Sequence, residues 1–349
     1  MLEVFETILN ILGAVVLLCV LVTVHELGHF GMGRLLGFRI EEFAIGMGPK
    51  VFSRKKNGTV YALRALPIGG MCRFYGEDET QDSSESFHAQ KPWKRFLVIL
   101  AGPAINIVFT VVLAAVFLMA YGVEDGVSPV VTEFAQDSKA RTGGMTLGDR
   151  LYAVDGVVIE NYEDTVNMIR AAGSDMVITV WRGGELRDIA LRGTYNAGLG
   201  YNSIGVVITY MTNFRRCGFF EAAGKSVPFV AGLVRQLFQA IGGMFQNGVR
   251  QGDIVGAVGT VAVMSQAIKT GFDLVLYIMI FLGISLAVMN LLPLPALDGG
   301  KLIFILIELA RGKPVPPEKE GMVHFVGLVL LLGLVVLITI SDIKLLIGG

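Results

Sequence analysis

The sequence predicts a polytopic α-helical membrane protein with four spans, a β-hairpin, and one mixed α+β domain between the second and third spans. Of its 349 residues, 53% are apolar and only 17% are charged. A soluble domain is usually about 45–50% apolar and about 25% charged. Several stretches also reach the roughly 20 apolar residues that a bilayer crossing needs. Spans alone cannot account for the full length, so a domain-sized remainder is expected between them.

Four apolar stretches are expected to cross the bilayer: residues 8–24 with their continuation to residue 30, 96–121, 274–292 and 325–340. A shorter apolar piece, residues 302–309, follows two prolines and is expected to form a half-helix. We therefore divide the chain into the first two spans (1–121), a mixed domain (122–195), a connecting region (196–271) and the last two spans (272–349).

Charge asymmetry predicts the orientation of the spans. Residues 31–95 contain 11 Lys/Arg and 7 Asp/Glu, and residues 301–321 contain four Lys/Arg. The positive-inside rule places both segments in the cytoplasm. Residues 122–271, with 13 basic and 14 acidic side chains, have the balance of a translocated domain. Both termini are then outside the cytoplasm. The net charge of −1 excludes a nucleic-acid partner held by a strong basic field.

The segment between the first two spans predicts a β-hairpin at about residues 38–75. Residues 37–45, 51–53 and 59–66 are β-like, and Asn57-Gly58 favours a type I′ turn. A hairpin of this kind has an edge strand that could pair with an extended substrate. A surface hairpin without that role is the alternative.

The mixed domain has strand, turn and helix signals in close succession. Strands are expected over 127–134, 151–154, 157–159, 176–181 and 186–191. A helix is expected over 162–171, capped by Asn161. In the connecting region, residues 219–246 form an amphipathic pattern with one apolar face, made by Val230, Val234, Leu237, Ile241 and Met244. This pattern predicts a helix on the membrane or against the spans, although a core helix of the outer domain fits equally well.

The sharpest chemical feature is His25-Glu26-Leu27-Gly28-His29 at the end of the first span. Two histidines at i and i+4 lie on one side of a helix and can give two nitrogen ligands to one zinc ion. The glutamate beside the first ligand can take a proton from the attacking water. Ionisable groups inside a membrane are costly and usually functional. We therefore predict Zn²⁺ as cofactor and Glu26 as the catalytic base.

A third zinc ligand is expected from Asn290-Leu291-Leu292-Pro293-Leu294-Pro295-Ala296-Leu297-Asp298-Gly299-Gly300. Asp298 lies at the end of the third span, on the same predicted side of the membrane as His25 and His29. Pro293 and Pro295 cannot continue a helix, which frees backbone groups at this depth. Asn290 is suited to holding a substrate backbone or an oxyanion. A structural helix cap with a solvent-facing Asp298 is the alternative.

The two motifs together, HExxH and N-x-x-P-x-P-x-L-D-G, resemble those of the site-2 protease family of intramembrane zinc metalloproteases, and most closely its bacterial RseP/RasP branch. The resemblance covers nearly the whole chain. Gly102-Pro103-Ala104-Ile105-Asn106 is similar to the GPxxN element of the family. Pro67-Ile68-Gly69-Gly70 resembles the segment after the family's membrane-associated hairpin. Residues 252–259 resemble a segment that usually reads SGPxGI, although the proline is missing here.

The mixed domain is similar to a PDZ domain. Residues 138–145, followed by Gly148-Asp149-Arg150-Leu151 and Val154-Asp155-Gly156, resemble the pattern A-x-x-A-G-L, GD-x-I, V-N-G. A single copy fits the single-PDZ members of the family. Such a domain could filter substrates by their bulk or by a free C-terminus.

The resemblance implies a zinc metalloendopeptidase of the bacterial cytoplasmic (inner) membrane that cleaves single-span membrane proteins in or near their spans. An anti-sigma factor or leftover signal peptides are the implied substrates. We assign substrate binding to a set of loop and helix residues: Asn290, Pro293, Pro295, Gly69, Gly70 and Asn106. Two alternatives have different consequences. A membrane-anchored protease of soluble or misfolded proteins would need a third ligand soon after HExxH, and a PDZ scaffold would need no metal.

Overall fold

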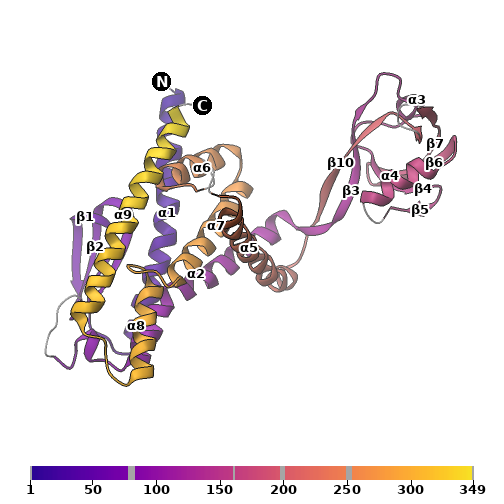
Figure 1. Cartoon of the computed structure of the whole chain (residues 1–349). Helices are drawn as coiled ribbons and strands as arrows, with labels where there is room; N and C mark the ends of the chain where they lie inside the picture. The colour runs from indigo at the N-terminus through magenta and orange to yellow at the C-terminus, as the bar shows by residue number, and fades with distance from the viewer. Residues whose placement is uncertain (1, 78–82, 160–161, 197–200, 249–253, 348–349) are drawn as a thin grey trace. The chain divides into compact units, whose positions relative to one another are not determined.

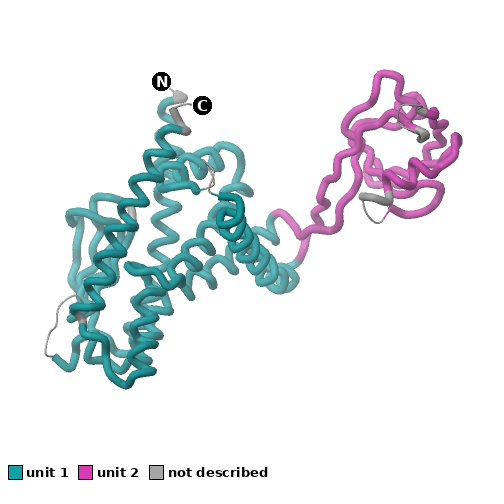
Figure 2. The backbone as a smooth tube through the Cα atoms, in the orientation of Figure 1, with its two compact units in different colours: residues 1–120, 218–349 teal, residues 121–217 magenta. Residues whose placement is uncertain are grey.

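The computed structural model describes residues 2–77, 83–159, 162–196, 201–248 and 254–347. The chain forms two compact units, one made of residues 1–120 and 218–349 and the other of residues 121–217 (Figure 2). The first unit is helical with a small β-sheet, and the second is the mixed α+β unit between the second and third spans.

Four helices of the first unit are long and apolar enough to cross a membrane (Figure 1). They are α1 (Leu2–Leu35), α2 (Pro92–Tyr121), α7 (Phe272–Leu291) and α9 (Pro317–Ile347). This confirms the predicted fold class and all four predicted spans. The predicted half-helix belongs to α8 (Asp298–Arg311), which begins directly after the proline-containing loop and ends at Gly312 in the left-handed conformation.

Two further helices, α5 (Phe219–Asn247) and α6 (Ala257–Thr270), complete the first unit. Two residues of the predicted apolar face of α5 pack against the spans: Val230 is buried and Val234 partly buried in a cluster with Ala114 of α2 and Ile280 of α7. Phe220 and Phe245, near the two ends of the helix, are 88% and 87% exposed. Helix α5 therefore packs against the spans and is not a core helix of the outer domain. Helix α6, which packs against α1, α7 and α9, was not predicted.

The predicted hairpin is formed by β1 (Ile40–Lys56) and β2 (Thr59–Phe74). Asn57 and Gly58 both have positive φ, 49° and 83°, as a type I′ turn requires. Each strand is bent and pairs twice, so residues 40–45 lie between residues 70–74 on one side and residues 60–63 on the other. Among the described residues, 70–74 pair with 40–45 only, and β2 packs against α1.

The mixed unit contains one twisted antiparallel sheet. Its strands are ordered β10 (Val206–Arg215), β3 (Val123–Phe134), β4 (Arg150–Val154), β6 (Asp175–Arg182) and β7 (Glu185–Arg192), with β5 (Val157–Val158) paired to β4. The strands β8 (Thr194–Asn196) and β9 (Tyr201–Ser203) form a small hairpin. Helices α3 (Lys139–Thr142) and α4 (Tyr162–Ala171) complete the unit. We expected it to end at residue 195, but it extends to 217 because β10 pairs with β3.

Local signals explain most of this unit. Ser138 caps α3 by accepting a hydrogen bond from the Arg141 N–H at 3.2 Å. Asp155 and Gly156 form the turn between β4 and β5 with φ of 49° and 80°. The alternating residues Met176, Ile178 and Val180 of β6 point into the core. The helix α4 has the predicted bounds, whereas its expected cap, Asn161, lies outside the described residues.

The mixed unit is stabilised by a carboxylate buried beside its sheet. Asp149 is 1% exposed and accepts hydrogen bonds from the Thr146 N–H at 2.8 Å and from Arg182 Nε at 2.6 Å. Burial by itself raises the pKa of a carboxyl. The hydrogen bonds from Arg182 and Thr146 outweigh burial and hold the pKa of Asp149 below its ordinary value. The ionised carboxylate is therefore part of the folded unit.

Asp149→Ala should destabilise this unit by roughly 3 kcal/mol, because it leaves Arg182 and the Thr146 N–H without their acceptor. Hydrogen exchange of β6 and β7 in the full chain measures this loss. The pKa of Asp149 in the folded protein lies below its value in the unfolded chain, which is about 3.9. The stabilisation is therefore complete at pH values well above about 3.9 and is lost as the pH falls through the folded pKa. Wild type and variant should therefore converge below about pH 4. Asp188→Ala, which removes an exposed carboxylate from β7, is the control, and an equal loss there would contradict the prediction.

Candidate metal centre and active site

Helix α1 places His25, Glu26 and His29 next to α2. The i, i+4 spacing turns both imidazole rings toward the same side of the helix. Close packing of the two helices needs two glycines. A β-carbon at Gly28 would meet the Ala101 carbonyl oxygen, and one at Gly102 would fall on the His29 ring. The glycines of HELGH and of the Gly102–Asn106 segment therefore make room for the rings.

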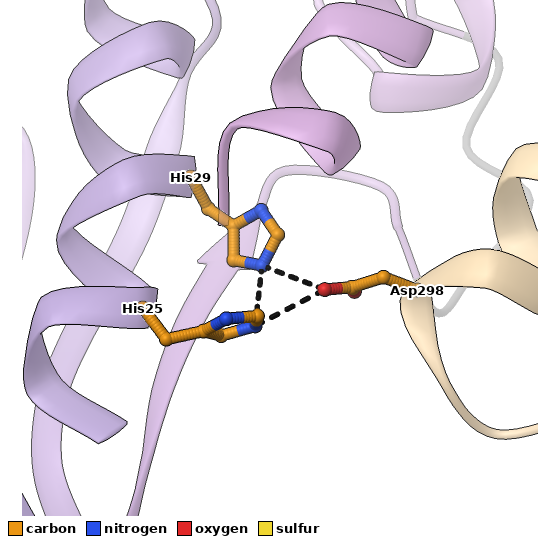
Figure 3. Close-up of side chains that lie close together, drawn as sticks. All are labelled: His25, His29 and Asp298. Atoms are coloured by element: carbon orange, nitrogen blue, oxygen red, sulfur yellow. Dashed lines mark hydrogen bonds and ion pairs between the residues drawn. The ribbon is translucent and has the colours of Figure 1, made fainter. Parts of the chain in front are cut away.

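Asp298 reaches the same point from the first residue of α8. The preceding loop turns sharply: a β-carbon at Gly299 would meet the Leu292 carbonyl, and one at Gly300 would meet that of Leu294. Both glycines therefore allow the loop to fold back on the helix start. Figure 3 shows the three side chains pointing toward one another from the two elements.

The distances between the three side chains fit a shared metal ion. His25 Nε2 lies 3.2 Å from His29 Nε2, and Asp298 Oδ2 lies 3.0 Å from the first and 3.3 Å from the second. A tetrahedral zinc ion with bonds of about 2.0 Å has ligand–ligand edges of about 3.3 Å. The observed triangle matches these edges, and the donor set of two imidazoles and one carboxylate is typical of catalytic zinc, which keeps a fourth position open.

Hydrogen bonding to His29 supports the same fit. Its Nδ1 lies 2.9 Å from the Val98 carbonyl oxygen, which can only accept. The proton therefore resides on Nδ1, and the lone pair of Nε2 points at His25 and Asp298. This outer-shell arrangement is the one that orients histidine ligands in metal sites.

Glu26 lies at the wall of a polar cavity next to the triangle. The cavity has a volume of about 280 Å³ and is lined by side chains of α1, α2, β2 and α8, among them His25, Glu26, His29, Cys72, Asp298 and Lys301. A β-carbon at Gly70 would come within 2.8 Å of Glu26 Cγ, so this glycine keeps the strand close to the carboxylate. The cavity therefore leaves room for water on the side of the triangle that Glu26 lines.

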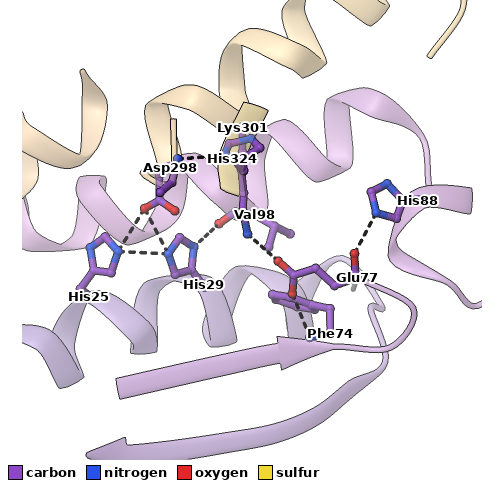
Figure 4. A network of polar contacts seen from close by, with 10 residues as sticks. His25, His29, Phe74, Glu77, His88, Val98, Asp298, Lys301 and His324 are labelled. Atoms are coloured by element: carbon purple, nitrogen blue, oxygen red, sulfur yellow. Dashed lines mark hydrogen bonds and ion pairs between the residues drawn. The ribbon is translucent and has the colours of Figure 1, made fainter. Parts of the chain in front are cut away.

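An ion pair joins the hairpin to α8 beside this cavity. Lys301 Nζ donates to Glu77 Oε1 at 2.7 Å, and the Phe74 N–H donates to Glu77 Oε2 at 3.2 Å (Figure 4). Burial opposes ionisation of Glu77, but the Lys301 ammonium outweighs it and holds the pKa of Glu77 below its usual range. Lys301 is one turn after Asp298, so the pair fixes α8 relative to the end of β2. No sequence pattern predicted this pair, because its partners are 224 residues apart.

Five of the six predicted substrate-binding residues lie at different places around the site. Gly70 lines the cavity, whereas Gly69 is at the preceding bend with φ of 80°. Asn290 is partly exposed in the last turn of α7, and Pro293 is exposed in the loop. Pro295 packs against α9, where a β-carbon at Gly327 would meet its ring. The structure therefore brings only Gly70 of these five to the metal triangle.

Asn106 is the one predicted substrate-binding residue whose position argues against that role. It is fully buried, and its side-chain Nδ2 lies 3.4 Å from His25 Nδ1. A side chain with no exposed surface cannot contact a substrate. Asn106 therefore contacts a predicted metal ligand instead.

His324 of α9 is a residue that sequence reasoning missed. Its Nδ1 accepts a hydrogen bond from the Ala296 N–H at 2.9 Å, and its ring lies 5.5 Å from that of Phe304. Ala296 has φ of 70°, which costs a non-glycine residue about 1–3 kcal/mol. A signal was present, since His324 is one of only four histidines, but its partner could not be inferred. His324 holds the loop that leads into Asp298.

His324→Phe should loosen that loop, because phenylalanine keeps the ring but leaves the Ala296 N–H without an acceptor. We expect zinc to be removed by a chelator about tenfold faster than from wild type. In His324→Asn the side-chain carbonyl can still accept, so zinc loss should be closer to wild type. Equal rates for all three proteins would show that His324 does not support the site.

Comparison with known proteins places this site in a family. Residues 13–334 match the model of peptidase family M50. The zinc metalloprotease RasP of Geobacillus kaustophilus is 30% identical over 97% of this chain and 99% of its own, and RasP of Shouchella clausii is 28% identical over 96% and 99%.

Among solved structures, a PDZ domain of an SdrC-like protein from Listeria monocytogenes is similar to 25% of this chain and to 90% of its own length, with 18% identity and a TM-score of 0.22. The family match covers both motifs that build the metal triangle, as well as all of the mixed unit. The chain belongs to peptidase family M50 and is a membrane-embedded zinc metalloprotease of the site-2 protease type.

Proposed function

We propose that this metalloprotease cleaves single-span membrane proteins within or near their transmembrane segments, as in regulated intramembrane proteolysis. The observation that carries the proposal is the position of His25, Glu26 and His29 on α1, a helix apolar and long enough to cross a membrane. A protease whose ligand triangle is built on a span meets its substrates at the depth of the bilayer. Anti-sigma factors and remnant signal peptides have the required single span.

We assign the zinc ligands to His25, His29 and Asp298. When bound, zinc is a Lewis acid that polarises the scissile carbonyl and makes water a strong nucleophile at neutral pH. Glu26 faces the same cavity and is positioned to remove the proton from the attacking water and then to deliver it to the leaving amine. Val98 orients His29 through its carbonyl oxygen.

A transmembrane helix must unwind before one of its peptide bonds can react, because its backbone groups are bonded within the helix. Residues 70–74 offer a strand edge directly at the cavity. Addition of the unwound substrate to this edge would replace the lost backbone hydrogen bonds. Gly69, at the bend before this edge, sets its direction. Asn290, Pro293 and Pro295 are proposed to contact the substrate where it leaves the edge.

The proposed orientation follows from charge. The hairpin segment and the α8–α9 connection contain most of the basic excess, which favours a cytoplasmic position for both and for the nearby metal triangle. The mixed unit and both termini then lie outside the cytoplasm. The bilayer is that of the bacterial inner membrane.

The mixed unit is proposed to be a substrate filter with a PDZ-like fold. Among the described residues, β10 is an edge strand of the sheet and pairs with β3 only. Its other edge could pair with an extended C-terminal peptide. Exclusion of substrates with a bulky outer domain is the other way in which it could act. Either way, prior trimming of the outer domain of the substrate would be required.

Co-expression with a panel of single-span reporters tests the proposal. Reporters with a trimmed outer domain should be cleaved and those with an intact folded outer domain should not, and a membrane-permeant zinc chelator should abolish cleavage. Reporters without a span, including an unfolded soluble protein, should survive. Cleavage of the spanless reporters at the same rate would favour the membrane-anchored protease of soluble proteins instead.

A further inference from the structure

Asn106 has a side-chain polar atom that is buried without a hydrogen-bond partner among the described residues. The residue is on α2, one helical turn after Gly102, and is 0% exposed. Its Nδ2 lies 3.4 Å from His25 Nδ1 (the ring nitrogen that faces away from the metal triangle), while its Oδ1 is buried without a hydrogen-bond partner among the described residues. An orphaned buried acceptor is costly and calls for an explanation.

The two histidines of the triangle differ in the group that contacts Nδ1, the ring nitrogen that faces away from the triangle. A carbonyl oxygen, that of Val98, faces His29 Nδ1 at 2.9 Å and can only accept. The partner of His25 is an amide, which can present either a donor or an acceptor. If the Asn106 amide nitrogen faces His25, Nδ1 must accept and the ring proton resides on Nε2. That proton would then point at Asp298 Oδ2, which lies 3.0 Å from His25 Nε2. It would occupy the space that a metal ion needs.

Rotation of the Asn106 amide by half a turn moves the ring proton of His25 from Nε2 to Nδ1. The two ends of an amide have nearly the same shape, so Oδ1 can take the place of Nδ2 without displacing neighbours. Oδ1 then accepts from His25 Nδ1–H, and the lone pair of Nε2 is directed into the triangle. The same rotation gives the orphaned oxygen its partner.

We propose that Asn106 is a positioning residue that sets the tautomer of His25, with its carbonyl oxygen holding the Nδ1–H form that can ligate zinc. The inference rests on the proposed ligand set of His25, His29 and Asp298. It also gives the Gly102–Asn106 segment one combined role. Gly102 leaves space for the imidazole rings, and Asn106, four residues later on the same face of α2, selects the nitrogen that bears the proton.

Zinc affinity of purified full-length variants, measured by competition with a chelator of known affinity, tests this role. Asn106→Leu keeps the branching of the side chain but has no acceptor, and it should bind zinc 10–100-fold more weakly than wild type. Asn106→Asp keeps an acceptor and should stay within about threefold of wild type. The control is Thr110→Val, also fully buried on α2, where the hydroxyl donates to the Asn106 backbone carbonyl at 2.7 Å; it too should stay within about threefold.

A measurement on the wild-type protein covers the case in which a variant does not fold. The chain has only four histidines, so ¹⁵N-histidine NMR of zinc-loaded protein can resolve each ring, with His25→Gln for assignment. We expect His25 to bear its proton on Nδ1. A proton on Nε2, or an Asn106→Leu variant with wild-type affinity, would overturn the inference.

The outcomes for the two proposals are separable. If wild type binds zinc, His25→Ala and Asp298→Ala lose it, and Asn106→Leu does not, the ligand set stands and the role of Asn106 is wrong. If wild type binds no zinc, or His25→Ala binds it as well as wild type, the proposed ligand set fails and the role of Asn106 fails with it.

Discussion

Glu26→Gln should abolish proteolysis while leaving the zinc content of the protein unchanged. Glutamine has the size of glutamate but cannot accept the proton of the attacking water, and loss of a general base costs about 10²–10⁴-fold in rate. Glu26 lines the cavity but is not part of the triangle formed by His25, His29 and Asp298. Cleavage of a purified single-span reporter in detergent, followed over time, measures the loss.

The zinc content of the same sample is the internal control. Loss of zinc together with activity would mean that Glu26 supports the ligands and is not the base. Wild-type cleavage by Glu26→Gln would remove the assignment of the base altogether. Glu77→Gln, a change at another carboxylate of the same cavity, should retain far more activity, because Glu77 accepts from Lys301 and from the Phe74 N–H and is not part of the triangle.

Gly102→Ala should remove both zinc and activity through one added methyl group. The β-carbon would fall on the Nε2 and Cε1 atoms of His29 and come within 2.9 Å of His25 Cε1. The rings must then move, and the 3.2 Å separation of the two Nε2 atoms cannot be kept. We expect a loss of zinc affinity of at least 100-fold, since a ligand in the wrong place contributes no bond. Metal analysis of the purified variant measures this effect.

A matched alanine substitution separates the local clash from a general effect on helix packing. Gly31 is on α1, two residues after His29, and a β-carbon there would meet no atom within 4 Å among its surroundings. Gly31→Ala should therefore retain zinc and activity, with a slight gain in helix stability of up to about 1 kcal/mol. If both variants lose zinc equally, the clash at the histidine rings is not the cause.

Sequence reasoning succeeded where the signal is local. The spans follow from apolar runs, the hairpin turn from Asn57-Gly58, and the helix α4 from the capping residue Asn161 and the two acidic residues that follow it. The pairing of His25 with His29 follows from helical spacing alone. Asp298 was predicted as the third ligand because it lies at the end of a span, on the same predicted side of the membrane as His25 and His29.

Sequence reasoning failed where the information is in the tertiary structure. The mixed unit extends beyond residue 195 because β10 pairs with β3, a contact between strands about 75 residues apart. Asn106 was expected to bind substrate, yet it is buried against His25. Helix spacing places Asn106 on the same face as Gly102, but only the packing of α2 on α1 decides that this face meets the histidines. The same holds for the contacts of Glu77 with Lys301 and of His324 with Ala296.

The bond that the enzyme cuts is the most direct test of the account. Wild-type protein and a single-span reporter would be reconstituted together in lipid vesicles, and the masses of the two fragments would locate the cleaved bond. We predict one or a few adjacent bonds within or next to the apolar span of the reporter, with cleavage lost in Glu26→Gln and after zinc removal. Cleavage confined to the soluble flanks of the reporter, or cleavage that persists in Glu26→Gln, would contradict a zinc site that acts inside the membrane.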